Sequence, residues 1–295
     1  MYFKRLEKCM LCPRHCSINR YKSRGICGAG SNISLSYYST HMGEEPIISG
    51  NKGSGTIFFT YCNLGCIYCQ NKKIVDGYGK DITFNRFKDI VFELIDSGAH
   101  NINFVTPTHF LAHVEYFLKK YKSKIPIPIV YNTSSYEDNN SLKSLNGLID
   151  VYLADFKYMD NNLSKMYSNC SNYSDIAKVS IDEMYKQVGK YKIDNGLIKK
   201  GLIIRILILP GHINDSKEII KYIYDRYGDN IIISIMGQYY PINKTKYSNL
   251  NRSLKIEEYN EVVNYAYDLG IRNAFIQDLD SSSDDFIPNF DINIL

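Results

Sequence analysis

Three closely spaced cysteines constrain this chain more than any other feature of its sequence. Cys62, Cys66 and Cys69 form the pattern C-x3-C-x2-C. The apolar residues 56–59 precede them and predict a short buried strand, so the thiols are expected on a loop at its carboxyl end. Three clustered thiolates can hold three corners of a four-iron cluster and leave the fourth iron open. A zinc site and three reduced core thiols are the alternatives.

A second group of cysteines lies near the N-terminus. Cys9, Cys12, Cys16 and Cys27 have the spacing C-x2-C-x3-C-x10-C, and four thiols suffice for a closed metal site. The segment around them is too short and polar to build a core, so we expect a bound metal to order it. Zinc and a second iron–sulfur cluster both fit the spacing, and His15 could replace one thiol. Such a site would be structural or would relay electrons.

The composition narrows the class of protein. With 295 residues, 44% of them hydrophobic, the chain can form one large α/β domain with a small appendage. A net charge of +4 without a long basic run does not indicate nucleic-acid binding. We expect a cytoplasmic protein, because no apolar run is long enough to span a membrane and the N-terminus lacks a signal region. Cysteines gathered in two groups favour metal binding over disulfides.

Short apolar runs alternate with segments of helical period over most of the chain. This alternation predicts a parallel sheet with right-handed crossovers, and six such units form a partial (β/α)6 barrel of TIM type. Thr83 is a predicted N-cap and Gly98 a predicted helix stop. The expected strands are residues 56–60, 101–106, 127–131, 150–154, 202–209, 231–236 and 273–276. The expected helices are residues 84–97, 110–121, 181–191, 216–227 and 256–269.

We therefore divide the chain into three parts. Residues 1–55 form a Cys-rich N-terminal extension and connector, residues 56–280 the barrel core, and residues 281–295 a C-terminal tail. In barrels of this type the chemistry gathers where the strands end, so polar residues that follow strands are the candidates for a site.

Charged residues at two strands stand out among these candidates. Asp155 and Lys157 lie two positions apart beyond a strand, so both side chains are expected to face the barrel mouth. Asp155 is suited to hold a cation or an ammonium group and Lys157 to bind a carboxylate, although an ion pair that braces the barrel is the alternative. Arg205 lies within an apolar strand and must be paired, either with a ligand carboxylate or with an acid such as Asp155.

Other residues have an ordinary explanation beside the functional one. His109 could act as a base or ligand, but it also suits the start of a helix. Glu44 and Glu45, close to His41, could be acid–base or substrate-binding groups, but adjacent carboxylates in a connector are more often solvated. Cys170 stands alone and is expected to be a small buried hydrophobe.

The loop of Cys62, Cys66 and Cys69 resembles that of the radical S-adenosylmethionine superfamily, in which an aromatic residue such as Tyr68 typically precedes the last cysteine. The resemblance implies that these cysteines bind a [4Fe–4S] cluster whose open iron binds S-adenosylmethionine. It also implies reductive cleavage of this cofactor to a 5′-deoxyadenosyl radical.

Within the superfamily, the chain resembles the branch of the pyruvate formate-lyase activating enzyme and its PflX-like relatives. The matching segments are residues 12–16, 44–46, 55–59, 69–71, 101–109, 131–133, 155–158, 209–211 and 238–239. One departure is Ile206, where the pattern leads us to expect a histidine. The resemblance places Tyr68 and Asn71 against S-adenosylmethionine. It also places the cofactor site at Thr106, Asn132 and Asp155, and Lys157 belongs to the same D-x-K element. Arg205, which a cofactor carboxylate could pair, is a further candidate for the cofactor site, and Asp155 and Lys157 are the candidate catalytic pair.

We therefore expect a radical S-adenosylmethionine oxidoreductase that abstracts hydrogen from a protein glycine, a peptide or a small molecule. Its expected partners are an electron donor such as flavodoxin or ferredoxin and a glycyl radical enzyme or peptide substrate; neither nucleic acid nor membrane is expected. One alternative is a zinc-binding module for nucleic acid or protein, with Cys9 and Cys12 forming one half-site and Cys66 and Cys69 the other. A two-cluster electron carrier is another.

Overall fold

A single mixed sheet forms the centre of the computed structural model, which describes residues 3–242 and 244–277. Its strands are β1 Ile33–His41, β2 Ser54–Phe59, β3 Lys80–Ile82, β4 Ile102–Val105, β5 Ile129–Thr133, β6 Val151–Asp155, β7 Lys192–Asp194, β8 Leu197–Leu207, β9 Ile232–Met236 and β10 Ala274–Gln277. Their order is β10-β9-β8-β6-β5-β4-β2-β1-β3, with β7 paired to β8 alone. The strands from β2 to β10 in this order run parallel.

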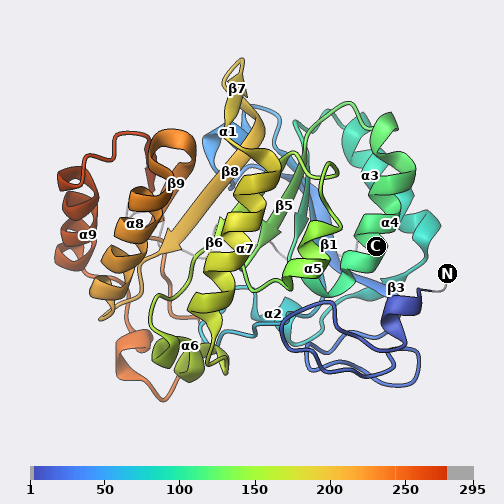
Figure 1. The fold of residues 1–295 in the computed structure, drawn as a ribbon, viewed down its shortest axis with the longest axis horizontal. Coiled ribbons are helices and arrows are strands. Elements are labelled where there is room, and N and C mark those ends of the chain that lie inside the picture. Colours follow the sequence, from blue (N-terminus) through green and yellow to red (C-terminus); the bar gives the residue numbers. More distant parts are fainter. Residues whose placement is uncertain (1–2, 243, 278–295) are drawn as a thin grey trace.

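The helices are α1 Pro46–Ser49, α2 Lys72–Val75, α3 Phe84–Asp96, α4 Leu111–Tyr121, α5 Asn139–Lys143, α6 Asn161–Ser168, α7 Tyr173–Val188, α8 Ile213–Tyr227 and α9 Ile256–Asp268. The longer helices pack over the outer face of the sheet (Figure 1). Helix α1 lies on the other face, where its Ile48 packs with Ile203 of β8. Among the strands that the structure describes, β3 and β10 end the sheet without pairing with each other, so the barrel is open. The predicted partial (β/α)6 barrel is confirmed.

The alternation of side chains along each strand separates the core from the site. On β8, Ile204 and Ile206 pack into the main core, whereas Ile203 belongs to a smaller apolar cluster on the other face. Arg205 shares that other face, because successive side chains of a strand point to opposite sides. The parallel register places Arg205 directly beside Asp155 of β6. Two charged groups from distant segments thus meet on the inner face of the sheet.

Local signals in the sequence account for several element boundaries. The hydroxyl of Thr83 accepts a hydrogen bond from the backbone N–H of Arg86 at 3.1 Å, so Thr83 caps α3 as predicted. Beyond the other end of this helix, Gly98 adopts φ +86°, a conformation that favours glycine.

The structure differs from the sequence expectations in the segment before β2. Residues 31–55, expected as a connector, contain strand β1, which pairs antiparallel with both β2 and β3. Its serines made the segment look like a loop, but Ser34 and Ser36 are buried. Ser36 donates to the carbonyl oxygen of Tyr78 at 2.5 Å and lies 3.2 Å from the hydroxyl of Thr60. Polar residues with partners of this kind can occupy a buried strand.

Several other elements of the structure differ from the sequence prediction. Strands β3 and β7, the first part of β8 before residue 202, the helices α1, α2, α5 and α6, and the start of α7 at Tyr173 were not predicted. The predicted tail, residues 281–295, lies outside the described residues. Within residues 3–242 and 244–277, the helices are all too short or too polar to cross a membrane.

Candidate functional site

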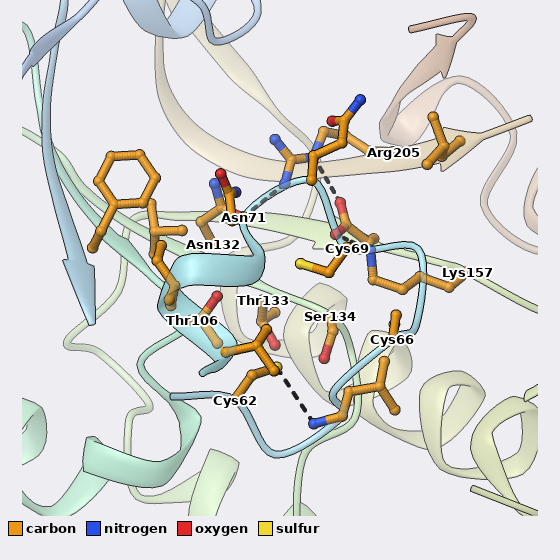
Figure 2. A pocket seen from close by; sticks show the side chains of 18 of the residues that line it. Cys62, Cys66, Cys69, Asn71, Thr106, Asn132, Thr133, Ser134, Lys157 and Arg205 are labelled. Atoms are coloured by element: carbon orange, nitrogen blue, oxygen red, sulfur yellow. Dashed lines mark hydrogen bonds and ion pairs between the residues drawn. The ribbon is translucent and has the colours of Figure 1, made fainter. Parts of the chain in front are cut away.

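A pocket opens where the parallel strands end (Figure 2). Phe58 of β2, Val105 of β4, Thr133 of β5, Asp155 of β6 and Leu207 of β8 all line it. Every pocket residue expected from the sequence also lines it, namely Cys62, Cys66, Tyr68, Cys69, Asn71, Thr106, Asn132, Asp155, Lys157 and Arg205. The fold therefore gathers residues that span more than 140 positions of the chain around one space.

The three cysteines of the loop have free thiols, and hydrogen-bond donors lie against their sulfur atoms. The backbone N–H of Leu64 lies 3.4 Å from Cys62 Sγ, and the hydroxyl of Ser168 lies 3.0 Å from Cys66 Sγ. Burial raises the pKa of Cys62 and raises that of Cys69 to about 12, against the opposing charge of Lys157. Half-buried thiols that are approached by donors and a cation suit thiolate ligands of a positively charged group.

Backbone conformation shapes the loop that carries these thiols. Tyr61, directly before the first cysteine, has φ +74°, and Gly65 has φ +67°. Thr106, at the end of β4, has φ +56°, which is unusual for a β-branched residue. Strained conformations of this kind cluster at functional sites.

A network of charges spans the pocket from β6 to β8. Arg205 Nε donates to Asp155 Oδ1 at 2.7 Å, and its two terminal nitrogens donate to Glu44 Oε2 at 3.0 Å and Asn132 Oδ1 at 2.8 Å. Lys157 Nζ donates to the other oxygen of Asp155 at 2.8 Å. The guanidinium therefore joins three segments, and its pairing satisfies the sequence expectation that it cannot stand alone.

The two carboxyl groups of this network have pKa values that are shifted in opposite directions. Burial alone would raise the pKa of Asp155, but Arg205 and Lys157 outweigh it and hold that pKa below its usual value. Burial also raises the pKa of Glu44, and Arg205 opposes this shift without overcoming it. With both carboxylates ionised the two acids balance the two bases. Glu44 is then the member that takes up a proton first as the pH falls.

Glu44 is the residue whose role the sequence analysis underrated. Its side chain is only 8% exposed, so it is not the solvated carboxylate expected of a connector. It accepts hydrogen bonds from Asn103 Nδ2 at 2.9 Å and Asn132 Nδ2 at 3.2 Å. The segment between β1 and β2 carries it into the pocket. Its membership of the matched Glu-Glu-Pro segment was the available signal.

Aromatic and amide side chains close the pocket beside the loop. The ring of Tyr68 lies 6.3 Å from that of Tyr158 and 6.2 Å from that of Tyr239. Gln70 Nε2 donates to the carbonyl oxygen of Gln238 at 2.9 Å, which ties the loop to the segment after β9.

Ser134 completes the polar lining, and its buried hydroxyl oxygen has no hydrogen-bond partner among the described residues. A polar atom left unpaired in this way fits a site that is completed by a bound ligand.

Other candidates lie away from the pocket. His109 is buried outside the pocket lining, and its Nε2 lies 2.7 Å from the carbonyl oxygen of Thr60. Burial lowers its pKa to about 3, so it is neutral and supports the loop from behind. Cys170 is buried with its sulfur 3.4 Å from Asn172 Oδ1, in agreement with a structural role.

Comparison with known proteins agrees with this geometry. Residues 56–223 match the family model of the Radical SAM superfamily. The chain belongs to this superfamily. It is 33% identical over 276 residues to the uncharacterized protein MJ0674 of Methanocaldococcus jannaschii. The alignment covers 88% of this chain and 74% of that relative. Radical SAM enzymes use a [4Fe–4S] cluster to cleave S-adenosylmethionine by a radical mechanism, so the chain is an enzyme rather than a zinc-binding module or a simple electron carrier.

Solved structures show the same fold. SuiB of Streptococcus suis bound to the precursor peptide SuiA superposes with a TM-score of 0.53 at 13% identity, over 74% of this chain and 47% of SuiB. SuiB bound to S-adenosylmethionine gives a TM-score of 0.52 at the same identity, over 74% and 48% of the two chains. This chain thus spans about half the length of SuiB, and at such low identity the likeness concerns the fold alone.

Proposed function

We propose that Cys62, Cys66 and Cys69 hold the [4Fe–4S] cluster and that the pocket beside them binds S-adenosylmethionine. The support is that the three thiols line the same pocket as a balanced set of charged groups and an unpaired hydroxyl. When bound, the cluster supplies the electron that cleaves the sulfonium and releases the 5′-deoxyadenosyl radical.

The protein's own residues would bind and orient the cofactor. The carboxylates of Asp155 and Glu44 suit its ammonium group, and the cations of Arg205 and Lys157 suit its carboxylate. Phe58 and the apolar residues near it offer a surface for the adenine ring. Because Asp155 already joins Arg205 and Lys157, we assign the pair Asp155 and Lys157 to orienting the reacting groups.

We propose that the radical abstracts hydrogen from a peptide or protein glycine, as in the activating-enzyme branch. The support is the set of segments that resemble that branch, together with the precursor peptide that SuiB, a protein of the same fold, binds. Ile206 replaces the histidine expected in that branch, so a small-molecule substrate is the second candidate. A low-potential donor of the flavodoxin or ferredoxin class would deliver the electron.

Cofactor cleavage provides the first test of this proposal. Anaerobically reconstituted protein with dithionite and S-adenosylmethionine should form 5′-deoxyadenosine, and the variant Cys62→Ala should form none, because one corner of the cluster loses its ligand. The matched control is Cys170→Ala, which removes a buried thiol outside the pocket and should retain the activity. Equal product formation by Cys62→Ala and the unaltered protein would contradict the assignment.

A further inference from the structure

The four N-terminal cysteines converge on one place in the structure. The backbone N–H of Cys9 donates to Ile18 at 2.9 Å and that of Ser17 donates back to Cys9 at 3.0 Å, which folds the first three cysteines into one loop. A Cβ built on Gly25 would lie 3.2 Å from Cys27 Sγ and 3.7 Å from Cys16 Sγ. The fourth cysteine therefore reaches the same loop from eleven residues further along the chain.

These thiols also act on one another electrostatically. Cys12 lies close enough to Cys27 and Cys9 to interact with their charges. Cys27 interacts in the same way with Cys9 and Cys16. Two of these free thiols, Cys9 and Cys12, are buried, and the other two are half-buried. Four neighbouring thiols of this kind are the ligand set that a bound metal group requires.

We propose that Cys9, Cys12, Cys16 and Cys27 bind a second iron–sulfur cluster, fully coordinated by protein thiolates and separate from the cluster at the catalytic loop. The inference does not depend on the substrate or branch proposed above.

The N-terminal segment needs such a site to hold its shape. Its own apolar cluster is small and packs against Ala112 of α4; it consists of Phe3, Leu6, Cys9, Leu11, Cys16 and Ile18. Between η1, Lys4–Leu6, and the start of β1 the segment contains no helix or strand. All its thiols are free, so disulfides do not close the loop. A metal group is the remaining covalent constraint for a segment with so small a core.

The spacing of the thiols favours a cluster over a single zinc ion. In residues 3–242 and 244–277, no three His, Cys, Asp or Glu side chains surround a position for one metal ion. The catalytic cysteines Cys62, Cys66 and Cys69 share this property, although their superfamily uses them for a four-iron cluster. Thiolates of a cluster bind different irons and stand farther apart than ligands of one ion. The N-terminal thiols are thus neighbours of one another without surrounding a single ion, as ligands of a cluster would be.

Arginines beside the N-terminal site offset its negative charge and join it to the catalytic loop. Arg20 lies close enough to Cys27 to offset the negative charge of its thiolate. Arg14, between two of the N-terminal cysteines, donates to the carbonyl oxygens of Asn63 at 2.9 Å and Leu64 at 3.3 Å. These two residues lie inside the catalytic C-x3-C pattern. Ordering of the N-terminal loop by its cluster therefore also fixes the loop that holds the catalytic cluster.

Metal content of two complementary variants tests the proposal. We expect the anaerobically reconstituted full-length protein to contain about eight irons and eight sulfides per monomer, from two four-iron clusters. The triple variant Cys62→Ala, Cys66→Ala, Cys69→Ala should retain about four of each and show an EPR signal when reduced. The control Cys170→Ala should retain about eight irons.

The outcomes separate a cluster from zinc and from no metal. A triple variant with one zinc and no iron would show that the N-terminal thiols bind zinc, and one without metal would show that they bind none; both overturn the proposal. The number of irons per monomer in the unaltered protein tests the second cluster without relying on the folding of a variant. About four irons would leave no iron for a second cluster and would overturn the proposal. This result is also distinct from failure to cleave S-adenosylmethionine, which concerns the catalytic loop.

Discussion

Arg205 shows at the residue scale how a charge enters an apolar strand. Sequence reasoning predicted that it must be paired and left open whether a ligand or an acid pairs with it. The structure gives it Asp155, Glu44 and Asn132. These partners lie between 50 and 161 positions away, so only the register of the folded sheet brings them together. The need of Arg205 for a partner follows from its burial, whereas the identity of the partners follows from the tertiary structure.

Removal of this guanidinium should be far more costly than removal of an exposed one. In Arg205→Gln, the buried carboxylates of Asp155 and Glu44 lose their shared cation, and we expect a loss of about 3–5 kcal/mol in the free energy of unfolding. The comparison variant Arg226→Gln breaks a pair with Asp182 whose side chains are 49% and 36% exposed. We expect it to cost about 0–1 kcal/mol.

Anaerobic urea denaturation of both arginine variants measures these costs. Equal losses in the two variants would show that the network at β6 and β8 contributes no more than a surface ion pair.

At the scale of elements, four of the longer helices, α3, α4, α8 and α9, were predicted well and the N-terminal part poorly. The helices predicted at 84–97 and 256–269 became α3 and α9, because each has a continuous apolar face. Strand β1 was missed, because the hydrogen bonds that satisfy its serines come from Thr60 and Tyr78. A polar strand and a loop look alike when the partners of the polar groups are unknown.

The contact between the N-terminal segment and the loop of Cys62, Cys66 and Cys69 depends on a glycine. Gly28 has φ +93°, and a Cβ there would lie 2.6 Å from the ring of Tyr61. We expect Gly28→Ala to cost about 1–3 kcal/mol through backbone strain and to displace Tyr61, which directly precedes Cys62. Gly30→Ala is the control, because no atom lies within 4 Å of its added Cβ.

Two measurements apply to this glycine pair, namely the melting temperature and the rate of tryptic cleavage in the N-terminal segment. Gly28→Ala should melt at a lower temperature and be cleaved faster than Gly30→Ala. Indistinguishable variants would mean that the segment does not depend on this contact.

At the scale of the whole molecule, the open barrel was predictable and its extended edge was not. The alternation of strands and helices determines parallel order, and strand ends determine where the pocket lies. The addition of β1 and β3 beyond β2 depends on antiparallel pairing of short segments that have no strong pattern. Most pocket residues could be named from the sequence because they follow predicted strands. Glu44 could not be placed, because it follows β1, a strand that was not predicted.

Low pH should lower the free energy of unfolding through a histidine that lies between the barrel and the N-terminal segment. His113 of α4 lies 2.9 Å from the carbonyl oxygen of Ser31, and burial, aided by Arg20, lowers its pKa from 6.5 to about 4. Because the folded-state pKa is below the unfolded one, His113 contributes stability that is present above pH 6.5 and lost as the pH falls through 4. At about 1.36 kcal/mol per pKa unit, the full contribution is about 3 kcal/mol, of which about 2 kcal/mol is lost by pH 5.

The variant His113→Gln keeps a donor for Ser31 and cannot titrate in this range. Its free energy of unfolding should therefore fall by about 2 kcal/mol less than that of the unaltered protein between pH 8 and pH 5. Urea denaturation at both pH values gives this difference. Parallel pH profiles for the two proteins would refute the role of His113.

The bonds of Arg14 have a consequence for the way the protein is made. Besides the loop of Cys62, Cys66 and Cys69, its guanidinium donates to the carbonyl oxygens of Ser168 at 3.0 Å and Asn169 at 2.6 Å, the latter 155 positions further along the chain. At ribosomal speeds of about 5–20 residues per second, roughly ten to thirty seconds separate the synthesis of the N-terminal cysteines from that of their docking surface. During that interval the thiols are exposed to oxidants. We therefore expect these cysteines to need protection during synthesis, or the metal group proposed for them to be loaded only after Ser168 and Asn169 have been made.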